Sequence, residues 1–147
     1  MNKKVLALAS IGATLLLAGC PSVNSPLNTA NQGASWVNIG VSTNNNILHE
    51  LDKASIKKNG NIVTFKDRKT IDNLSKEHFV NVPEYKTSIN TWQVNCSNRT
   101  FSLVDTQLFN KQGNSVYSYN YDATKRTFMK VSPGSAVEKQ YNYVCNK

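Results

Sequence analysis

This chain of 147 residues is poor in the residue types on which catalysis and metal binding most often depend. It has three cysteines and two histidines, His49 and His78. The sequence lacks a Gly-x-Ser-x-Gly motif, a phosphate-cradling glycine loop and a His-Glu-x-x-His motif. We therefore expect no enzyme activity, no cofactor and no bound metal.

Long apolar runs are also scarce, and the main one lies at the N-terminus. Residues 2–4 include two lysines, and residues 5–17 form an apolar run that is too short to span a bilayer. This run leads into Leu-Ala-Gly-Cys at residues 17–20, which resembles the lipobox of bacterial lipoproteins, where the cysteine becomes the acylated first residue. The resemblance implies a signal peptide over residues 1–19 and lipidation of Cys20 with acyl chains such as palmitate. The alternative is an ordinary signal peptide whose cleavage site contains a cysteine.

A lipid anchor determines where we expect the chain to function. Several acyl chains hold a protein in a membrane almost permanently, because each buried methylene adds about 0.8 kcal/mol. Pro21 takes the place of the aspartate that retains lipoproteins in the inner membrane, so the expected location is the outer membrane. Residues 20–35 carry no charge and few large apolar side chains, which predicts a flexible tether. Loss of residues 1–19 removes two lysines and no acid, and lowers the net charge from +8 to +6.

Residues 36–147 remain to form one domain, with a modest core that a covalent link would stabilise. Cys96 and Cys145 are an even pair in an oxidising compartment, which predicts a disulfide. Closing a loop of about 50 residues would stabilise the fold by about 4 kcal/mol. A metal site and a redox couple are the alternatives. Neither is favoured, because the histidines have no metal-ligand spacing to the cysteines and no Cys-x-x-Cys occurs.

Apolar residues that alternate with polar ones predict a series of antiparallel strands. Asn59-Gly60 predicts a hairpin turn, because both residues tolerate positive φ. Within residues 99–110 the apolar positions change parity, which predicts a bulge or burial on both faces. Residues 52–56 are predicted as one helical turn, and residues 72–84 as a short helix or a functional loop. The predicted strands cover residues 36–42, 47–51, 61–71, 85–96, 99–110 and 115–122.

The end of the chain changes to a helical period. Val137, Tyr141 and Val144 form an apolar stripe that includes Cys145, and Ser132 is placed as the N-cap with proline at the next position. A disulfide to Cys145 would fix this helix onto the central strands. The predicted fold is α+β, an antiparallel sheet of about five to six strands with a C-terminal helix packed on one face and one disulfide.

Several short stretches, taken in order, resemble one known family. These stretches are Trp36, Asp52-x-x-Ser55-Ile56, Asn59-Gly60-Asn61, Asn95-Cys96-Ser97-Asn98-Arg99-Thr100-Phe101, Pro133-Gly134-Ser135 and Tyr143-Val144-Cys145. In this order and spacing they resemble the surface-adhesin protein E family of small bacterial lipoproteins. The resemblance implies an antiparallel sheet with flanking helices and one disulfide, and a non-enzymatic outer-membrane adhesin that binds host matrix proteins such as vitronectin or laminin. The alternative is a periplasm-facing envelope lipoprotein that binds another envelope protein or a small ligand.

Clusters of basic residues provide a candidate binding site for an anionic partner. Clustered cations attract sulfated glycans, acidic matrix segments and lipopolysaccharide phosphates in a salt-dependent way. The alternative is a solvated surface without a specific partner. Nucleic acid is not an expected partner, because the chain is exported and contains no nucleic-acid recognition motif. The candidate residues are Lys66, Arg68, Lys69, Lys125 and Arg126.

Two further groups of side chains have both a functional and a structural interpretation. Tyr117, Tyr119 and Tyr121 share one strand face, which suits a planar ligand or a sugar, or else burial beneath a helix. His49 and Glu50 are neighbours near an aspartate, but they point to opposite faces of a strand and do not form an acid–base pair.

Overall fold

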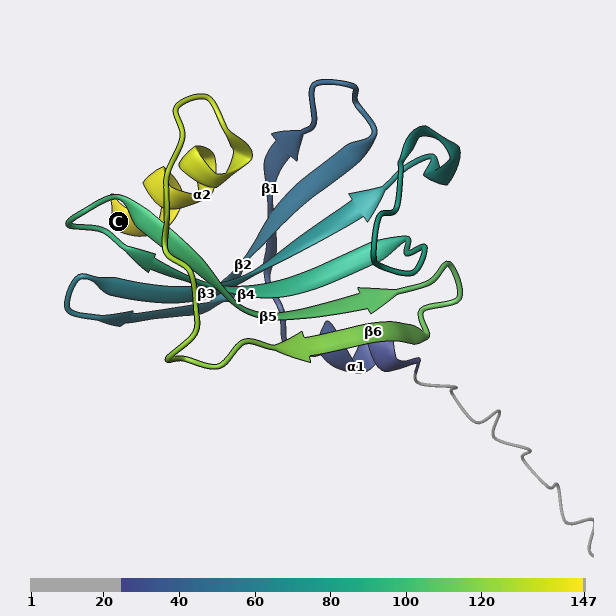
Figure 1. The fold of residues 1–147 in the computed structure, drawn as a ribbon, viewed down its shortest axis with the longest axis horizontal. Helices are drawn as coiled ribbons and strands as arrows, with labels where there is room; N and C mark the ends of the chain where they lie inside the picture. Colours follow the sequence, from purple (N-terminus) through teal and green to yellow (C-terminus); the bar gives the residue numbers. More distant parts are fainter. Residues whose placement is uncertain (1–24, 147) are drawn as a thin grey trace, which may run out of the picture.

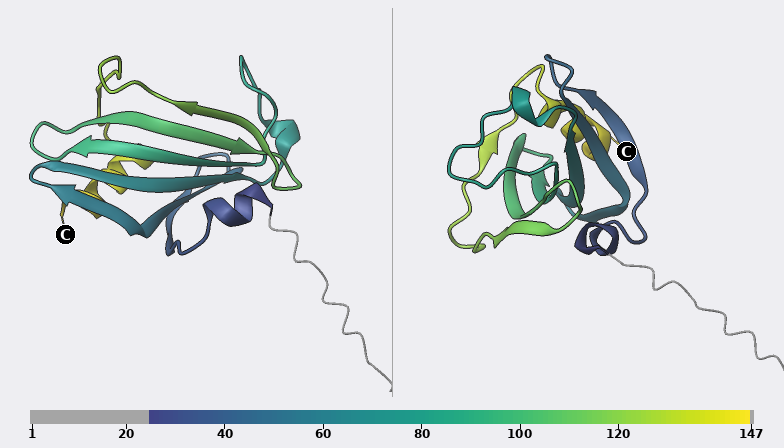
Figure 2. Two further views of the ribbon diagram at one scale, coloured as in Figure 1. Left: turned by 90° about the horizontal axis from the view of Figure 1, so that it is seen from below. Right: turned by 90° about the vertical axis from the view of Figure 1, so that its right-hand side faces the viewer.

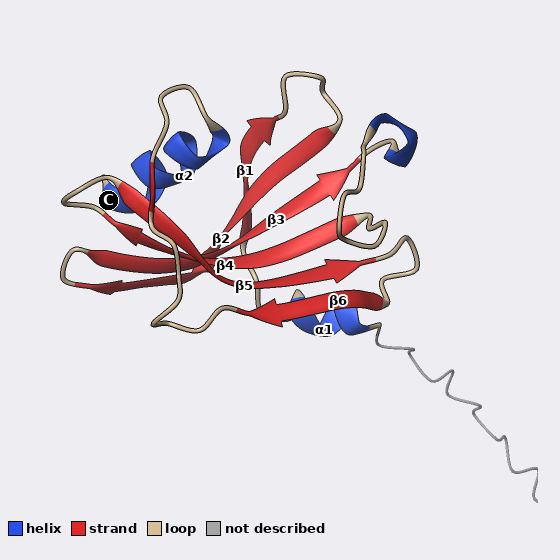
Figure 3. Cartoon of the chain, in the orientation of Figure 1, coloured by secondary structure: helices blue, strands red, loops and turns tan. Residues whose placement is uncertain are grey.

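The computed structural model describes residues 25–146, so the predicted signal peptide and Cys20 lie outside the described residues. The described part is a curved antiparallel sheet with one helix on each face (Figures 1 and 3). The elements are α1 (Pro26–Ala30), β1 (Trp36–Val41), β2 (Ile47–Asn59), β3 (Ile62–Ile71), the 3-10 helix η1 (Leu74–Lys76), β4 (Thr87–Asn95), β5 (Thr100–Phe109), β6 (Ser115–Asn120), β7 (Met129–Lys130) and α2 (Ala136–Cys145).

The strands follow one another across the sheet in chain order. β1 to β6 pair successively and antiparallel, and the short β7 pairs with β5 on the same side as β6. Figure 2 shows the sheet curling around α2, with α1 on the outer side. We call the two sides the concave face, which carries α2, and the convex face. The predicted α+β class, the antiparallel sheet and its C-terminal helix are confirmed.

The second strand is longer than its sequence pattern predicts. The expected helical turn at residues 52–56 is wrong, because β2 continues to Asn59 and only its register to β3 shifts between Asp52 and Lys57. Ser55 stabilises this bulge: its hydroxyl donates to the Asp52 carbonyl at 2.7 Å and accepts the Lys66 N–H at 2.7 Å. A serine next to an irregular backbone satisfies the groups that the ladder leaves open.

The two local irregularities expected at a hairpin turn and in a later strand are both present. Gly60 turns the chain between β2 and β3 with φ 57°. In β5, Asp105 pairs with Thr91 and Leu103 with Trp92, so Val104 is the extra residue of a bulge. The change of apolar parity in the sequence therefore marks a real break in the ladder.

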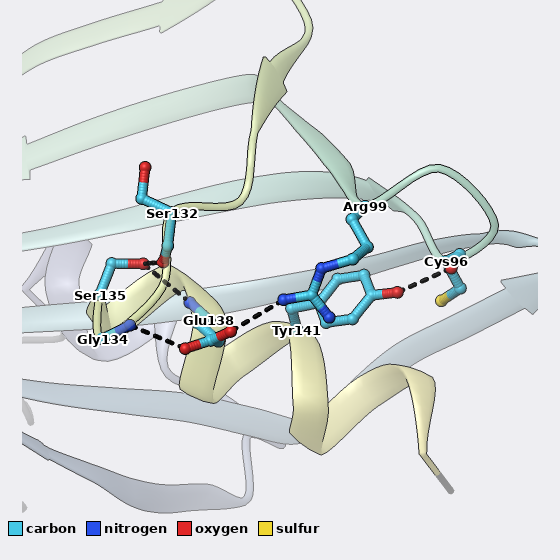
Figure 4. A network of polar contacts seen from close by, with 7 residues as sticks. All are labelled: Cys96, Arg99, Ser132, Gly134, Ser135, Glu138 and Tyr141. Carbon is cyan, nitrogen blue, oxygen red and sulfur yellow. Dashed lines mark hydrogen bonds and ion pairs between the residues drawn. The ribbon is translucent and has the colours of Figure 1, made fainter.

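Helix α2 begins three residues later than expected. Ser135, not Ser132, is its N-cap, and the Ser135 hydroxyl accepts the Glu138 N–H at 3.1 Å. The Glu138 carboxylate in turn accepts the Gly134 N–H at 2.8 Å and pairs with Arg99 at 2.8 Å (Figure 4). Serine and glutamate at this spacing resemble a capping box, except that the glutamate accepts the N–H of the residue before the cap, and together they fix the start of the helix.

The apolar stripe of α2 closes the main core on the concave face. Tyr141 and Val144 are buried against Leu51, Phe65 and neighbouring strand residues. Cys145 forms the expected disulfide with Cys96 of the β4–β5 turn, with 5.6 Å between the two Cα atoms. The Tyr141 hydroxyl donates to the Cys96 carbonyl at 2.7 Å (Figure 4). The predicted disulfide is thus confirmed, and a hydrogen bond supports it.

Residues 25–35 do not form the flexible tether expected over residues 20–35. Ser25 caps α1 and proline occupies its first position, both of which favour a helix start. The Leu27 N–H donates to the Gly113 carbonyl at 3.1 Å, and the Ser35 N–H donates to the buried Asp52 carboxylate at 2.7 Å. These residues bury little apolar surface, but tertiary hydrogen bonds hold them on the convex face, and composition does not predict such bonds.

Candidate functional site

The sheet separates the basic residues that the sequence groups together. Successive residues of β3 point to opposite faces, so Lys66 and Arg68 lie on the convex face and Lys69 lies on the concave face. Lys66 is exposed. These three residues therefore do not form one continuous patch.

Arg68 is already neutralised by its own surroundings. Its Nε donates to the Glu50 carboxylate at 2.7 Å, and its guanidinium lies 4.4 Å from the centre of the Trp36 ring. A further contact from Nη1 reaches the Asn31 side chain beside α1 at 3.3 Å. Because the two charged side chains are only 22% and 14% exposed, Arg68 acts as a link between α1, β1 and β2.

The two remaining candidates lie in the segment that follows β6. Arg126 donates to the Tyr121 carbonyl at 3.1 Å and to the Gln93 side chain at 3.0 Å, so it holds this segment against the sheet. Lys125 is exposed and lines a shallow hollow of about 310 Å³ that also includes Met129. Among the five candidates, Lys66 and Lys125 are exposed, whereas Arg68, Lys69 and Arg126 are partly buried.

A hollow of about 280 Å³ lies on the part of the concave face that α2 leaves open. Its wall combines aromatic, neutral polar and aliphatic side chains with one cation, and contains no acid. Helix α2 lies over β1 and β2, near the edge of the sheet that is opposite to the β6 edge (Figure 1). The lining residues are Lys69, Val82, Tyr85, Ser88, Asn90, Trp92, Leu103, Thr106, Leu108, Tyr117 and Tyr121.

The floor of this hollow is a chain of buried polar side chains. The Asn90 amide donates to one Asp67 oxygen at 2.7 Å and accepts the Thr106 hydroxyl at 2.6 Å. The other Asp67 oxygen accepts from Gln140 of α2 at 2.9 Å. Asp67 is fully buried, so this network fixes α2 and the floor of the hollow relative to each other.

Lys69 supplies the positive charge of the hollow. Its ammonium lies 5.7 Å from the centre of the Trp92 ring, and it forms no ion pair within residues 25–146. Burial, together with the charges of Lys69 and Lys139 and against that of Asp67, lowers the pKa of His49. A neutral His49 beside Lys69 is therefore the form present near neutral pH.

The 72–86 connection forms one rim of the hollow. It contains η1 and brings Tyr85 over the sheet, where the ring packs edge-on against Phe79 with 5.3 Å between centroids. Burial and the negative charge of Glu77 raise the pKa of the Tyr85 hydroxyl, which keeps it neutral. The short helix expected within residues 72–84 is present as η1, and Val82 of the same segment lines the hollow; a functional role for this loop stays a prediction.

The tyrosine row is at the open end of the face and not beneath α2. Tyr117 and Tyr121 line the hollow, and Tyr119 packs edge-on against Tyr121 at 4.7 Å while remaining 50% exposed. Period-two alternation correctly placed these rings on one face. The polar floor carried no sequence signal, because Asp67, Asn90 and Thr106 are far apart in the chain.

The acid–base residues near the start of β2 do not come together in the fold. Glu50 is paired with Arg68, whereas His49 lies on the opposite face, and the Asp52 carboxylate accepts backbone N–H groups. Within residues 25–146, no three histidine, cysteine or acidic side chains gather as a metal site. No helix in that range has the length and apolar character needed to cross a bilayer.

Comparison with known proteins assigns the fold and the family. The profile of the family described as surface-adhesin protein E matches residues 36–146. A crystal form II structure of Haemophilus influenzae protein E shares 16% identity, covers 76% of this chain and 87% of that chain, and has a TM-score of 0.52. Protein E from non-typeable Haemophilus influenzae shares 15% identity over 76% of this chain and 75% of that chain, with a TM-score of 0.51.

At such identities the likeness to solved structures is a likeness of fold. No curated protein matches the chain. The family match covers the sheet, α2 and both disulfide cysteines, which is most of the chain. This chain belongs to the surface-adhesin protein E family.

Proposed function

We propose that this chain is a lipid-anchored adhesin of the outer membrane that binds host extracellular-matrix components and has no catalytic role. The family match over residues 36–146 carries this proposal. In it, residues 1–19 are an export signal, Cys20 is the lipidated first residue, and residues 36–147 are the binding domain.

The docking of α1 limits how far such a domain stands from the membrane. From Cys20 to Ser25 the chain spans at most about 18 Å, because an extended residue covers about 3.6 Å. An anchored domain with α1 on its convex face is therefore held close to the lipid surface. Because Ser25 lies beside Gly113 of the β5–β6 turn, that end of the sheet lies nearest the lipid, and the concave face is the surface left free for a partner (Figure 1).

The basic character of the chain supports an anionic partner, such as an acidic matrix segment or a sulfated glycan. Lys66 and Lys125 are exposed cations, and Lys66 shares a hollow of about 260 Å³ with Lys57. Attraction by such charges is weakened by salt. Vitronectin, laminin and heparin are the ligands with which to test this proposal.

The anchor is tested by metabolic labelling of cells with a palmitate analogue. We expect the full-length chain to take up the label and a Cys20→Ser variant to lose it, while Cys96→Ser keeps it. Label that survives Cys20→Ser would refute lipidation at this residue.

Adhesion is tested with intact cells that display the chain. Their binding to immobilised vitronectin, laminin and heparin is measured at low and at physiological salt. We expect saturable binding above that of Cys20→Ser cells, and weaker binding after Lys66→Ala combined with Lys125→Ala. Arg68→Ala is unsuitable as a test, because it removes both the ion pair to Glu50 and the hydrogen bond to Asn31 beside α1.

Protease treatment of intact cells distinguishes surface display from a periplasm-facing chain. Cleavage without permeabilisation supports the adhesin. Protection until the outer membrane is opened, together with no saturable binding, would replace it by an envelope component that contacts a periplasmic partner.

A further inference from the structure

The open hollow of the concave face has the size of a site for one small molecule. Its volume of about 280 Å³ lies just below the range of about 300–1,000 Å³ typical of small-molecule sites, which suits a ligand of one ring. The buried network of Asp67, Asn90 and Thr106 gives it a rigid floor. A single ring with its substituents fits this space better than a folded protein segment.

The wall offers the two kinds of contact that a sugar requires. A sugar ring presents an apolar face of C–H groups and a rim of hydroxyl groups. Trp92, Tyr117 and Tyr121 supply aromatic surface, and tyrosines add a hydroxyl at the ring edge. Ser88 adds a hydroxyl that can donate, and the Thr106 hydroxyl, whose hydrogen is directed at Asn90, can accept.

The charge of the hollow selects among sugars. Lys69 has no ion-pair partner within residues 25–146, and no lining residue is acidic. The nearest carboxylate, Asp67, is buried under the floor with both oxygens engaged by Asn90 and Gln140. Lys69 is thus a cation at the aromatic wall whose charge a carboxylate or sulfate of a ligand would balance.

We propose that this hollow binds one acidic sugar unit, with the sugar ring against Trp92 and the neighbouring tyrosines and its carboxylate or sulfate against Lys69. The inference goes beyond adhesion to matrix proteins, because it requires only the hollow and holds wherever the chain is displayed. It also gives a role to the tyrosine row, which does not pack beneath α2.

Tryptophan fluorescence of the full-length chain tests the proposal, in a detergent without a sugar head group. A Trp36→Phe background leaves Trp92 as the single tryptophan and removes the one on the convex face. N-acetylneuraminic acid and glucuronic acid are titrated against glucose and N-acetylglucosamine. We expect a saturable change with the acidic sugars, at affinities about tenfold above those of the neutral sugars.

Charge variants test the assignment of Lys69. Lys69→Met should lower the affinity for acidic sugars about tenfold, to the level of neutral ones. Lys69→Arg should preserve the preference, and Lys66→Met, a lysine of the same strand on the opposite face, should leave it unchanged. Lys69→Arg and the salt dependence of acidic-sugar binding keep the test informative if Lys69→Met does not fold.

The proposal is overturned if acidic sugars give no saturable fluorescence change, or if Lys69→Met binds them as tightly as the parent chain. It is also overturned if Lys66→Met lowers the affinity for acidic sugars as much as Lys69→Met does. Adhesion to vitronectin or laminin without sugar binding would remove this inference and leave the proposed function intact. Sugar binding without adhesion to either protein would support this inference alone.

Discussion

The concave face of the sheet has two halves, one covered by a helix and one open to solvent. Over β1 and β2 it is covered by α2, joined to the β4–β5 turn by the Cys96–Cys145 disulfide, and closed by apolar side chains. Toward β6 it is open, and aromatic and polar side chains surround a hollow. Both halves come from strands with the same alternating pattern. The position of one helix therefore decides which residues become core and which become a binding surface.

The two halves are joined by a buried polar chain and are not independent. Gln140 of α2, Asp67 of β3, Asn90 of β4 and Thr106 of β5 are linked by consecutive hydrogen bonds of 2.6 to 2.9 Å. Such a network restricts the strands to one arrangement, because any slip leaves buried polar groups unsatisfied. A substitution that breaks this hydrogen-bond network should therefore change both the stability of the covered half and the shape of the open half.

The largest effect is expected from the disulfide, which belongs to the covered half. Replacing both Cys96 and Cys145 with alanine should lower the free energy of unfolding in urea by about 4 kcal/mol, since the bridge closes a long loop. Reduced parent protein is the matched control and should unfold with the double variant. A loss below about 1 kcal/mol would mean that α2 is held mainly by its packing.

The next largest effect should come from the residue that joins the halves. Asp67→Ala should cost about 3 kcal/mol, because it leaves Asn90 and Gln140 buried without their partner. Urea unfolding measures this loss, and exposed Asp72→Ala should change stability by less than about 0.5 kcal/mol. Equal effects of the two substitutions would contradict a coupling role for the network.

A smaller effect is expected where α1 meets the sheet. Gly113 has φ 78°, and an added Cβ would lie 2.9 Å from the Ser25 hydroxyl. Gly60 has φ 57° with no atom near its missing Cβ, so it controls for the backbone cost alone. We expect Gly113→Ala to destabilise by about 1 kcal/mol more than Gly60→Ala, as measured by thermal unfolding, and to release α1 to proteolysis. Equal losses would show that α1 docks loosely.

The smallest effect concerns pH and the boundary between the halves. His49 on β2 faces Asp67 and Lys69 of β3 and Lys139 of α2, and burial and the lysines lower its pKa below 6.5. As pH falls through about 6.5, the unfolded chain takes up a proton before the folded one, so stability falls. His49→Asn should reduce the stability lost between about pH 7.5 and 5.5 relative to the parent. An unchanged pH profile would mean that folding does not shift the pKa of His49.

Local patterns predicted those elements whose neighbours along the chain decide them. Alternation identified the six main strands, Asn59-Gly60 identified a hairpin, and the stripe from Val137 to Cys145 identified α2. The helical turn at residues 52–56 failed because pairing with β3 outweighs local propensity. The tether prediction failed for residues 25–35 because their stabilising partners, Gly113 and Asp52, lie elsewhere in the chain.

The candidate basic site shows the same division between local and long-range information. The sequence grouped Lys66, Arg68 and Lys69 by proximity, but alternation in β3 sends Lys69 to the other face. The sequence could not show that Arg68 is paired with Glu50, since the partner lies on another strand.

The sequence by itself determined the kinds of elements, their order and the two cysteines available for a bridge, because turn residues, periodicity and composition act over a few neighbours. The tertiary structure decided which half of the concave face α2 covers, which cations keep their charge available, and how Asp67, Asn90 and Thr106 meet beneath a hollow. These outcomes depend on contacts between strands far apart in the chain, whose register is set by the packing of the whole sheet.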